Sequence, residues 1–244
     1  MAERVALITG GARGIGRAIG LDLARAGWAV AFCYRTSAEA AAATQAEIER
    51  AGARALAVQT DVSDPGAAEA LVRRVEERWG RLDALINCAG PYHRVELLQE
   101  TPDGWRAMFE NNLHPVFYLS RAAAPGMIAR KSGRILAFSM ASADQFTAQP
   151  NVTAHYIAKA GILILVRSLA RALAPHGITV NAISPGFIDS GSAPKAELEA
   201  MRPRIPAGYV GSVDDAVAAA RFLLSPEARY VTGGNIHLSG GWGI

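Results

Sequence analysis

Two residues beyond the middle of the chain could carry acid–base chemistry. Tyr156 and Lys159 are three residues apart, which places both side chains on one face of a helix. An ammonium beside a phenol favours the phenolate, so the tyrosine pKa can fall below its reference value of about 10. A glycine-rich turn at residues 9–16 offers a place for a dinucleotide in the same chain. Together these features predict hydride transfer with Tyr156 as the acid.

The glycine-rich turn lies between an apolar run and an expected helix. Gly10, Gly14 and Gly16 would let the backbone approach a pyrophosphate, and the helix beginning near Ile15 would offer free N–H groups. The strict G-x-G-x-x-G pattern is absent, because Gly11 and Gly14 are three residues apart. The motif alone is therefore equally compatible with a plain tight turn.

The end of the expected second strand bears on which dinucleotide would bind. An acidic residue there would hold a ribose 2′-hydroxyl, but the chain has Tyr34 followed by Arg35. Arg35 and Arg13 can pair with a 2′-phosphate, although two solvated surface arginines would give the same pattern. Asp61, which precedes Val62, could accept from an adenine amino group or cap a turn. These residues favour NADP(H) over NAD(H).

Short apolar runs alternate with amphipathic segments along the whole chain. Strands are expected at residues 5–9, 29–34, 53–59, 82–87, 133–139, 179–184 and 235–238. Helices are expected at residues 14–26, 38–51, 65–79, 102–130, 153–174 and 213–224. The pattern predicts an α/β fold, a single domain over residues 1–244 with a doubly wound, Rossmann-type parallel sheet flanked by helices on both faces. Residues 186–211 are irregular and form a candidate lid.

Composition excludes several classes of protein. The formal charge of +3 comes without a run of basic residues, which argues against nucleic-acid binding. The apolar stretch 162–166 is too short to cross a bilayer, and no signal peptide precedes the first apolar run. Cys33 and Cys88 lie in apolar runs and are expected to be buried thiols. We therefore expect a soluble cytoplasmic protein without a metal site.

A set of motifs in a fixed order resembles the short-chain dehydrogenase/reductase family over essentially the full chain, and within it the 3-oxoacyl-carrier-protein reductases. The motifs are Thr9-Gly10-x-x-x-Gly14-x-Gly16, Asp61-Val62, Asn87-Cys88-Ala89-Gly90, Asn112, Tyr156-x-x-Lys159, Asn181, Pro185-Gly186-Phe187-Ile188 and Ser239-Gly240-Gly241.

The resemblance implies roles for individual residues. Tyr156 would be the catalytic acid/base, and Lys159 would hold the nicotinamide ribose and lower the tyrosine pKa. Asn112 would anchor a proton-relay water through a kinked helix, although taken alone it fits a helix cap or kink. Ile188 would contact the carboxamide through its backbone, and Ser190 stands where the family often has a threonine. Further cofactor contacts would come from Gly10, Arg13, Gly14, Ile15, Gly16, Asp61, Val62, Asn87, Ala89, Gly90, Pro185 and Gly186.

Two positions depart from the family pattern. Cys88 replaces an asparagine that is chiefly structural. Met140 stands where the family places a catalytic serine, and a methionine cannot donate a useful hydrogen bond to a carbonyl. Ser139 or Ser142 could take over, or Tyr156 could act without a serine. Ser142 is the preferred replacement because its sequence distance to Tyr156 is more suitable.

These features predict an NADP(H)-dependent oxidoreductase that interconverts a ketone and a secondary alcohol, with a 3-oxoacyl thioester as one possible substrate. The alternative is a dinucleotide-binding protein with weak or no catalysis, for which Met140 is the only support. The expected helix at 153–174 is apolar nearly all round, so we expect a homo-oligomer, a dimer or a tetramer; burial against the sheet would give the same pattern.

Overall fold

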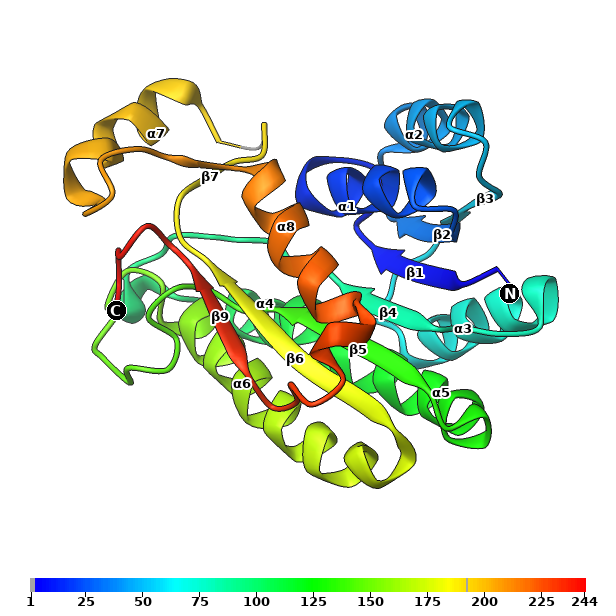
Figure 1. Ribbon diagram of the computed structural model, residues 1–244. Helices are drawn as coiled ribbons and strands as arrows, with labels where there is room; N and C mark the ends of the chain where they lie inside the picture. The colour runs from blue at the N-terminus through cyan, green and yellow to red at the C-terminus, as the bar shows by residue number, and fades with distance from the viewer. Residues whose placement is uncertain (1–2, 192) are drawn as a thin grey trace.

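One parallel sheet organises the molecule. The computed structural model describes residues 3–191 and 193–244. Its main sheet has seven parallel strands in the order β3–β2–β1–β4–β5–β6–β9 (Figure 1). The strands are β1 (Val5–Thr9), β2 (Ala29–Tyr34), β3 (Ala55–Gln59), β4 (Ala84–Asn87), β5 (Gly133–Phe138), β6 (Ile178–Pro185) and β9 (Asn235–Leu238). The predicted doubly wound fold is confirmed, and the strand order reverses between β1 and β4.

Helices cover both faces of the sheet. One face carries α1 (Gly14–Arg25), α2 (Ala38–Arg50) and α8 (Val213–Leu224), and the other carries α3 (Pro65–Trp79), α5 (His114–Arg130) and α6 (Thr153–Leu173) (Figure 1). Successive strand residues alternate between the two cores: in β1, Leu7 packs with the second group of helices, and Ala6 and Ile8 pack with the first. This double burial explains why the strands are unbroken apolar runs.

The helix expected over residues 102–130 is two helices. The first, α4 (Pro102–Asn112), ends one residue before a break at Leu113, and α5 starts at His114. Pro115 has no backbone N–H to donate to the carbonyl of Asn111, so the helical hydrogen-bond ladder is interrupted there. The break leaves Asn112 at the end of α4, where its side chain donates to the carbonyls of Met108 and Pro91.

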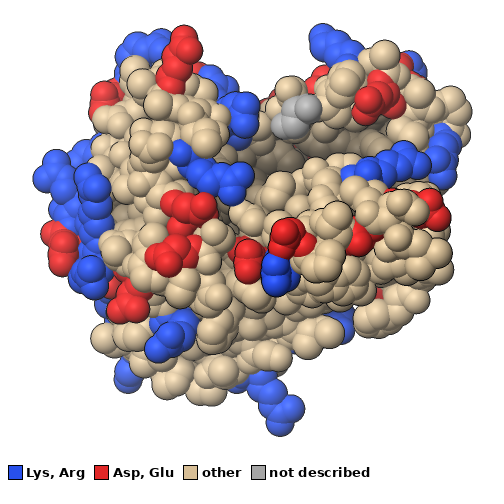
Figure 2. All heavy atoms as spheres, turned by 180° about the vertical axis from the view of Figure 1, so that it is seen from behind, with Lys and Arg blue, Asp and Glu red and all other residues tan. Residues whose placement is uncertain are grey.

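The irregular segment expected at residues 186–211 contains short elements. These are the parallel pair β7 (Ile188–Asp189) and β8 (Gly211–Ser212), and helix α7 (Lys195–Met201), which stands beyond the carboxyl ends of the strands in Figure 1. Single 3₁₀ turns occupy Leu97–Gln99, Ala174–His176, Arg202–Arg204 and Pro226–Ala228. Seen from behind, the upper side of the molecule is hollowed, with Lys and Arg side chains on both rims (Figure 2). Among the described residues, no helix is long and apolar enough to cross a membrane.

Candidate active site

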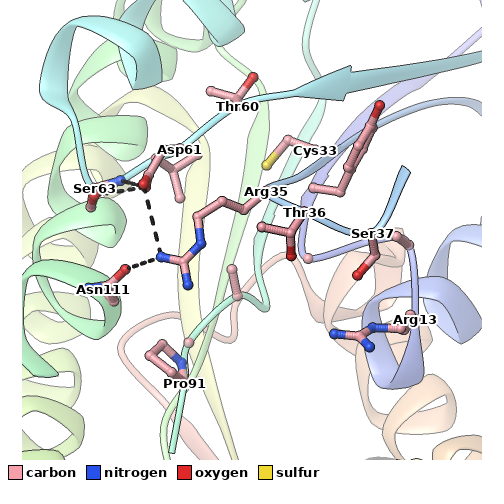
Figure 3. A pocket seen from close by; sticks show the side chains of 16 residues that line it. Arg13, Cys33, Arg35, Thr36, Ser37, Thr60, Asp61, Ser63, Pro91 and Asn111 are labelled. Carbon is pink, nitrogen blue, oxygen red and sulfur yellow. Dashed lines mark hydrogen bonds and ion pairs between the residues drawn. The ribbon is translucent and has the colours of Figure 1, made fainter. Parts of the chain in front are cut away.

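A pocket lies at the carboxyl ends of β1, β2, β3 and β4, the position at which open α/β sheets bind ligands. Its volume is about 290 Å³. We call the turns that line it, at residues 10–13, 33–37, 60–63 and 89–91, the nucleotide end of the site. Figure 3 shows their side chains around the opening. We use the term substrate end for Asn112, residues 138–156 and Lys159, where the sequence predicts the catalytic groups.

The glycine turn leaves space and donors for an anion. Gly10 has a φ of +67°, and a methyl group added to Gly16 would lie 2.7 Å from the carbonyl oxygen of Gly10. Arg13 is the N-cap of α1 but makes no capping hydrogen bond through its side chain, and no acidic residue occupies the first turn, which contains Ile15. The first N–H groups of α1 therefore lack side-chain acceptors, and the helix dipole favours a negative charge there. This cradle fits a pyrophosphate.

The turn after β4 is held against the glycine turn. The Thr9 hydroxyl accepts hydrogen bonds from the backbone N–H groups of Cys88 at 3.0 Å and Ala89 at 2.9 Å. A methyl group on Gly10 would lie 3.2 Å from the Cα of Ala89. Asn87 is buried and donates to the carbonyl of Leu136 at 3.3 Å. The backbone of the turn thus borders the pocket, while Asn87 joins β4 to β5.

Arg35 crosses the nucleotide end toward the opposite wall. Its guanidinium donates to Asn111 Oδ1 at 2.9 Å and lies 3.9 Å from a carboxylate oxygen of Asp61, while Arg13 stands on the other side of the opening (Figure 3). Asp61 accepts from both the N–H and the hydroxyl of Ser63. The Ser63 hydroxyl is the main cause of the lowered Asp61 pKa, and Arg35 lowers the pKa further. Asp61 therefore caps a turn in this structure, the alternative that its sequence position left open.

Three residues of this wall went unnoticed in the sequence. Thr36 and Ser37 follow Arg35 in the pocket lining, and Ser37 precedes α2 without making a capping hydrogen bond through its side chain. Asn111, the partner of Arg35, lies beside the predicted Asn112. Polar residues directly before a helix were the available signal for Ser37. Val62, which was predicted, also lines the pocket.

Asn112 and Lys159 converge on Gly90. A methyl group on Gly90 would lie 2.4 Å from Asn112 Oδ1 and 3.2 Å from Lys159 Nζ. Asn112 donates to the carbonyls of Met108 at 3.0 Å and Pro91 at 3.1 Å, whereas its Oδ1 is buried without a partner. Lys159 donates to the carbonyl of Phe138 at 2.9 Å, and burial lowers its pKa to about 8. An ammonium with such a pKa can exchange protons near neutral pH.

The Tyr156 hydroxyl contacts the loop that follows β5. It donates to the carbonyl of Ser142 at 2.8 Å and accepts from the N–H of Thr147 at 3.2 Å. Ser142 has a φ of +65°, and its Cβ would lie 3.2 Å from a methyl group on Gly243. Ser142 thus contacts Tyr156 through its backbone carbonyl, and the predicted role of its hydroxyl toward a substrate stays a prediction.

Ser139 and His155 complete the surroundings of Lys159. The Ser139 hydroxyl donates to the Lys159 carbonyl at 2.7 Å, so it fastens β5 to α6. His155, which sequence reasoning passed over, is buried, and burial is the main cause and the Lys159 charge a second cause of a pKa lowered to about 3. Its signal in the sequence was its position four residues before Lys159, since such residues are neighbours on a helix.

The segment after β6 closes toward the glycine turn. Pro185 accepts from the N–H of Ala141, and Gly186 donates to the carbonyl of Leu238. A methyl group on Gly14 would lie 3.4 Å from the carbonyl oxygen of Ser190. The structure thus brings residues 185–190, including Ile188 in β7, to the edge of the nucleotide end.

Comparisons with known proteins agree with this architecture. Residues 10–243 match the family model described as enoyl-(acyl carrier protein) reductase. A 3-oxoacyl-[acyl-carrier-protein] reductase from Staphylococcus aureus is 38% identical over 97% of this chain and 96% of its own length. One from Escherichia coli is 35% identical over 98% and 96%.

Solved structures show the same likeness. A putative short-chain alcohol dehydrogenase from Sinorhizobium meliloti superposes with a TM-score of 0.92 at 33% identity, covering 99% of this chain and 97% of that one. Acetoin dehydrogenase from Enterobacter cloacae gives 0.89 at 30% identity, covering 99% and 96%. On these matches, the chain belongs to the short-chain dehydrogenase/reductase family of oxidoreductases, with the 3-oxoacyl-[acyl-carrier-protein] reductases among its relatives.

Proposed function

We propose that this oxidoreductase uses NADP(H) to interconvert a ketone and a secondary alcohol. The convergence of Lys159 and Asn112 on Gly90 is the observation that carries the proposal. Gly90 also lines the pocket whose other parts contain Arg13 and Arg35. A nucleotide lying along this pocket would therefore end beside a buried ammonium that can exchange a proton.

The choice of NADP(H) rests on the charges of the nucleotide end. Tyr34 ends β2, where a carboxylate would be needed to hold a ribose 2′-hydroxyl. Arg35 and Arg13 instead offer two guanidinium groups, and Ser37 stands at the start of α2. A 2′-phosphate would compete with Asn111 for Arg35, and a guanidinium–phosphate pair, in which both groups are charged, is stronger than a bond from Arg35 to a neutral amide oxygen.

The reaction needs a hydride and a proton. A bound nicotinamide supplies or accepts the hydride, and the protein's residues manage the oxygen and its proton. Lys159 holds a proton that it can release near neutral pH, and Asn112 has a buried acceptor free to orient a water or a hydroxyl group. Tyr156 stays the predicted acid/base; serving as the acid requires its hydroxyl to leave the Ser142 carbonyl. Ser142 likewise stays a prediction.

The substrate class follows from the relatives and the substrate end. Relatives that are 3-oxoacyl-[acyl-carrier-protein] reductases make a 3-oxoacyl thioester one candidate, and the acetoin dehydrogenase likeness makes a small hydroxyketone another. Met140 is half-buried and packs on the core, and the Phe146 side chain is exposed on the adjoining loop. These apolar groups are compatible with either substrate, so we propose a ketone substrate without choosing between the two.

A second candidate is a dinucleotide-binding protein with weak or no catalysis. Two observations favour it: Met140 provides no donor, and the Tyr156 hydroxyl is engaged with Ser142 and Thr147. The retained Lys159–Asn112 convergence favours the enzyme.

We also propose that the chain forms a dimer or a tetramer. Phe117 on α5 and Ile157 and Ile164 on α6 expose 45%, 42% and 57% of their surfaces. Burying such apolar surface against a second copy would be favourable. Sedimentation equilibrium tests this; a monomer at micromolar concentration would contradict it.

The functional proposal is tested by mixing the protein with NADPH and a panel of acetoin, cyclohexanone and a 3-oxobutanoyl thioester. Disappearance of the reduced nicotinamide absorbance measures turnover, and calorimetry measures NADPH binding separately. Turnover of one ketone supports the enzyme, whereas tight NADPH binding without any turnover supports the second candidate. Failure to bind NADPH would contradict both.

A further inference from the structure

The Tyr156 hydroxyl is held by two backbone groups of one loop, residues 142–147, which follows β5. The hydroxyl donates to the Ser142 carbonyl at 2.8 Å and accepts from the Thr147 N–H at 3.2 Å, and the tyrosine side chain is buried. A phenol has one proton to donate, and its oxygen can accept a hydrogen bond at the same time. Only the contact with Ser142 therefore competes with a substrate oxygen for the Tyr156 proton.

The Ser142 carbonyl can release the Tyr156 proton without losing its last partner. It also accepts from the Gln145 N–H at 3.0 Å, within the same loop. A buried polar atom that loses its only hydrogen bond costs about 1–3 kcal/mol, and the bond from Gln145 avoids that cost. A substrate oxygen can therefore replace the Ser142 carbonyl as the acceptor while the loop keeps its internal hydrogen bond.

The contact with Thr147 becomes stronger when Tyr156 acts as an acid. As the phenol gives up its proton, its oxygen becomes negatively charged, and a hydrogen bond to an ionised acceptor is about twice as strong as one to a neutral acceptor. A backbone N–H that already points at this oxygen needs no reorientation at that moment. The Thr147 N–H thus favours the charged form of Tyr156 over the neutral form.

A side-chain network attaches the loop to the edge of the sheet. Asp144 Oδ2 lies 2.8 Å from His237 Nε2 and accepts from the Asn235 amide at 3.4 Å, and both partners belong to β9. Asn235 in turn accepts from the Ser184 hydroxyl of β6 at 2.7 Å. The middle of the loop is therefore attached to two strands of the main sheet, independently of its contact with α6.

The backbone of the loop needs such an attachment. Ser142 and Phe146 have φ values of +65° and +53°, in the left-handed region. This region costs a residue with a side chain roughly 1–2 kcal/mol, and such conformations persist only where the surroundings hold them. Phe146 directly precedes Thr147, so its backbone conformation helps to set the direction of the N–H that meets Tyr156.

We propose that the Thr147 backbone N–H is a catalytic donor to the Tyr156 oxygen, and that Asp144 and His237 are the positioning residues that hold it there. The proposal rests on the function proposed above, with Tyr156 as the acid/base. In reduction, the carbonyl carbon receives the hydride, the π electrons of the C=O bond move to oxygen, and that oxygen takes the Tyr156 proton. The Thr147 N–H stabilises the phenolate, which is reprotonated from the Lys159 ammonium, and the lysine from water. In oxidation the same steps run in reverse.

A backbone ester at position 147 tests the donor itself. Replacing the peptide bond between Phe146 and Thr147 by an ester removes the N–H and keeps the side chain. With the ketone panel, kcat is expected to fall by about 10²-fold, within the range for removal of one donor to a developing negative charge. KM should change by less than about threefold, because the lost N–H contacts Tyr156 and not the substrate. An ester at Ala148, whose N–H does not contact Tyr156, is the matched control. Equal kcat values in the two esters would overturn the proposal.

Two variants of Asp144 test the positioning of the donor. Asp144→Ala removes both contacts with β9 and is expected to lower kcat by about tenfold, because a misplaced catalytic group loses rate without losing substrate affinity. Asp144→Asn keeps an oxygen that can accept from His237 and should recover most of the loss. A kcat close to that of the wild type in Asp144→Ala, or no recovery in Asp144→Asn, would overturn the positioning role.

A further readout does not depend on turnover. Hydrogen exchange of the Thr147 amide can be followed by NMR in the wild type, in Tyr156→Phe and in Asp144→Ala. Both variants should exchange this proton at least about tenfold faster, because one removes its acceptor and the other releases the loop. An unchanged exchange rate in Tyr156→Phe would overturn the contact. If the wild type binds NADPH but reduces no ketone, the proposed function fails; if it reduces ketones and the Thr147 ester is equally active, only the present inference fails.

Discussion

The nucleotide end of the site is formed mainly by backbone groups, whereas the substrate end is formed mainly by side chains. At the nucleotide end, glycines and free N–H groups shape the cradle, and a methyl group on Gly16 would already lie 2.7 Å from a backbone oxygen. At the substrate end, the proposed function depends on where the side chains of Asn112, Tyr156 and Lys159 point. Backbone geometry is fixed by the fold, whereas the contacts of a side chain also depend on the loop that packs against it, as residues 142–147 do against Tyr156.

The largest expected effect comes from Lys159, where the two ends meet. Lys159→Met keeps the length and apolar stem of the side chain but removes the ammonium. We expect kcat to fall by about 10²–10⁴-fold, because the proton source is lost. NADPH turnover across the ketone panel measures the change, and a melting curve checks that the variant is folded. A kcat close to that of the wild type would show that the reaction does not need the Lys159 ammonium.

The sequence predicted those parts of the site that are formed by backbone groups. Apolar runs predicted the seven strands of the main sheet because its central strands are buried on both faces, and the glycines and Arg35 predicted residues that line the pocket. The substrate end could not be predicted in this way. Spacing places Tyr156 and Lys159 on one face of a helix, but it does not show that their polar groups contact the backbone carbonyls of Ser142 and Phe138.

The structure differs from the sequence-based predictions at two further places, and each difference has a local cause. Nothing in the residue types indicated that Ser142 would adopt a left-handed backbone with a φ of +65° and turn its carbonyl toward Tyr156. The break at Leu113 could have been predicted from the sequence, because Pro115 cannot donate the hydrogen bond that a continuous helix requires.

Arg35→Ala tests whether the nucleotide end selects NADP(H) over NAD(H). Loss of a charge-assisted bond to a 2′-phosphate should raise the NADPH Kd by about 10–100-fold, corresponding to 1.5–3 kcal/mol for a hydrogen bond to a charged group. NADH, which lacks that phosphate, should bind with little change. Calorimetry with both cofactors measures the difference, and the exposed Arg50→Ala on α2 is the matched control. Equal losses for NADPH and NADH would remove Arg35 from cofactor selection.

The pH dependence tests the proton source at the substrate end. Burial depresses the Lys159 pKa to about 8, so the ammonium is present below that pH and is lost above it. Ketone reduction should therefore decline by about tenfold per pH unit above pH 8, while alcohol oxidation should rise toward pH 8 and then level off. Rates at saturating substrate and cofactor give the profile. A reduction rate that stays flat to pH 10 would show that the reaction does not depend on the Lys159 ammonium.

The smallest effect is expected from the loop hydroxyl. Ser142→Ala should change kcat by less than about threefold if the only contact of Ser142 with Tyr156 is through the backbone carbonyl, which the variant keeps. Ser139→Ala should act mainly on stability, costing about 1 kcal/mol for the lost bond to the Lys159 carbonyl. Urea unfolding and turnover separate the two effects. A hundredfold loss in Ser142→Ala would support the predicted role of the Ser142 hydroxyl as the donor that Met140 does not provide.

The central claim, an NADP(H)-dependent ketone reductase, is tested most directly by one ratio. We would measure kcat/KM for NADPH and for NADH with the ketone of the panel that is reduced fastest. The account predicts a ratio of at least about tenfold in favour of NADPH, the value of one favourable contact to the 2′-phosphate. A ratio of one or below, or no oxidation of either cofactor with any ketone, would contradict it.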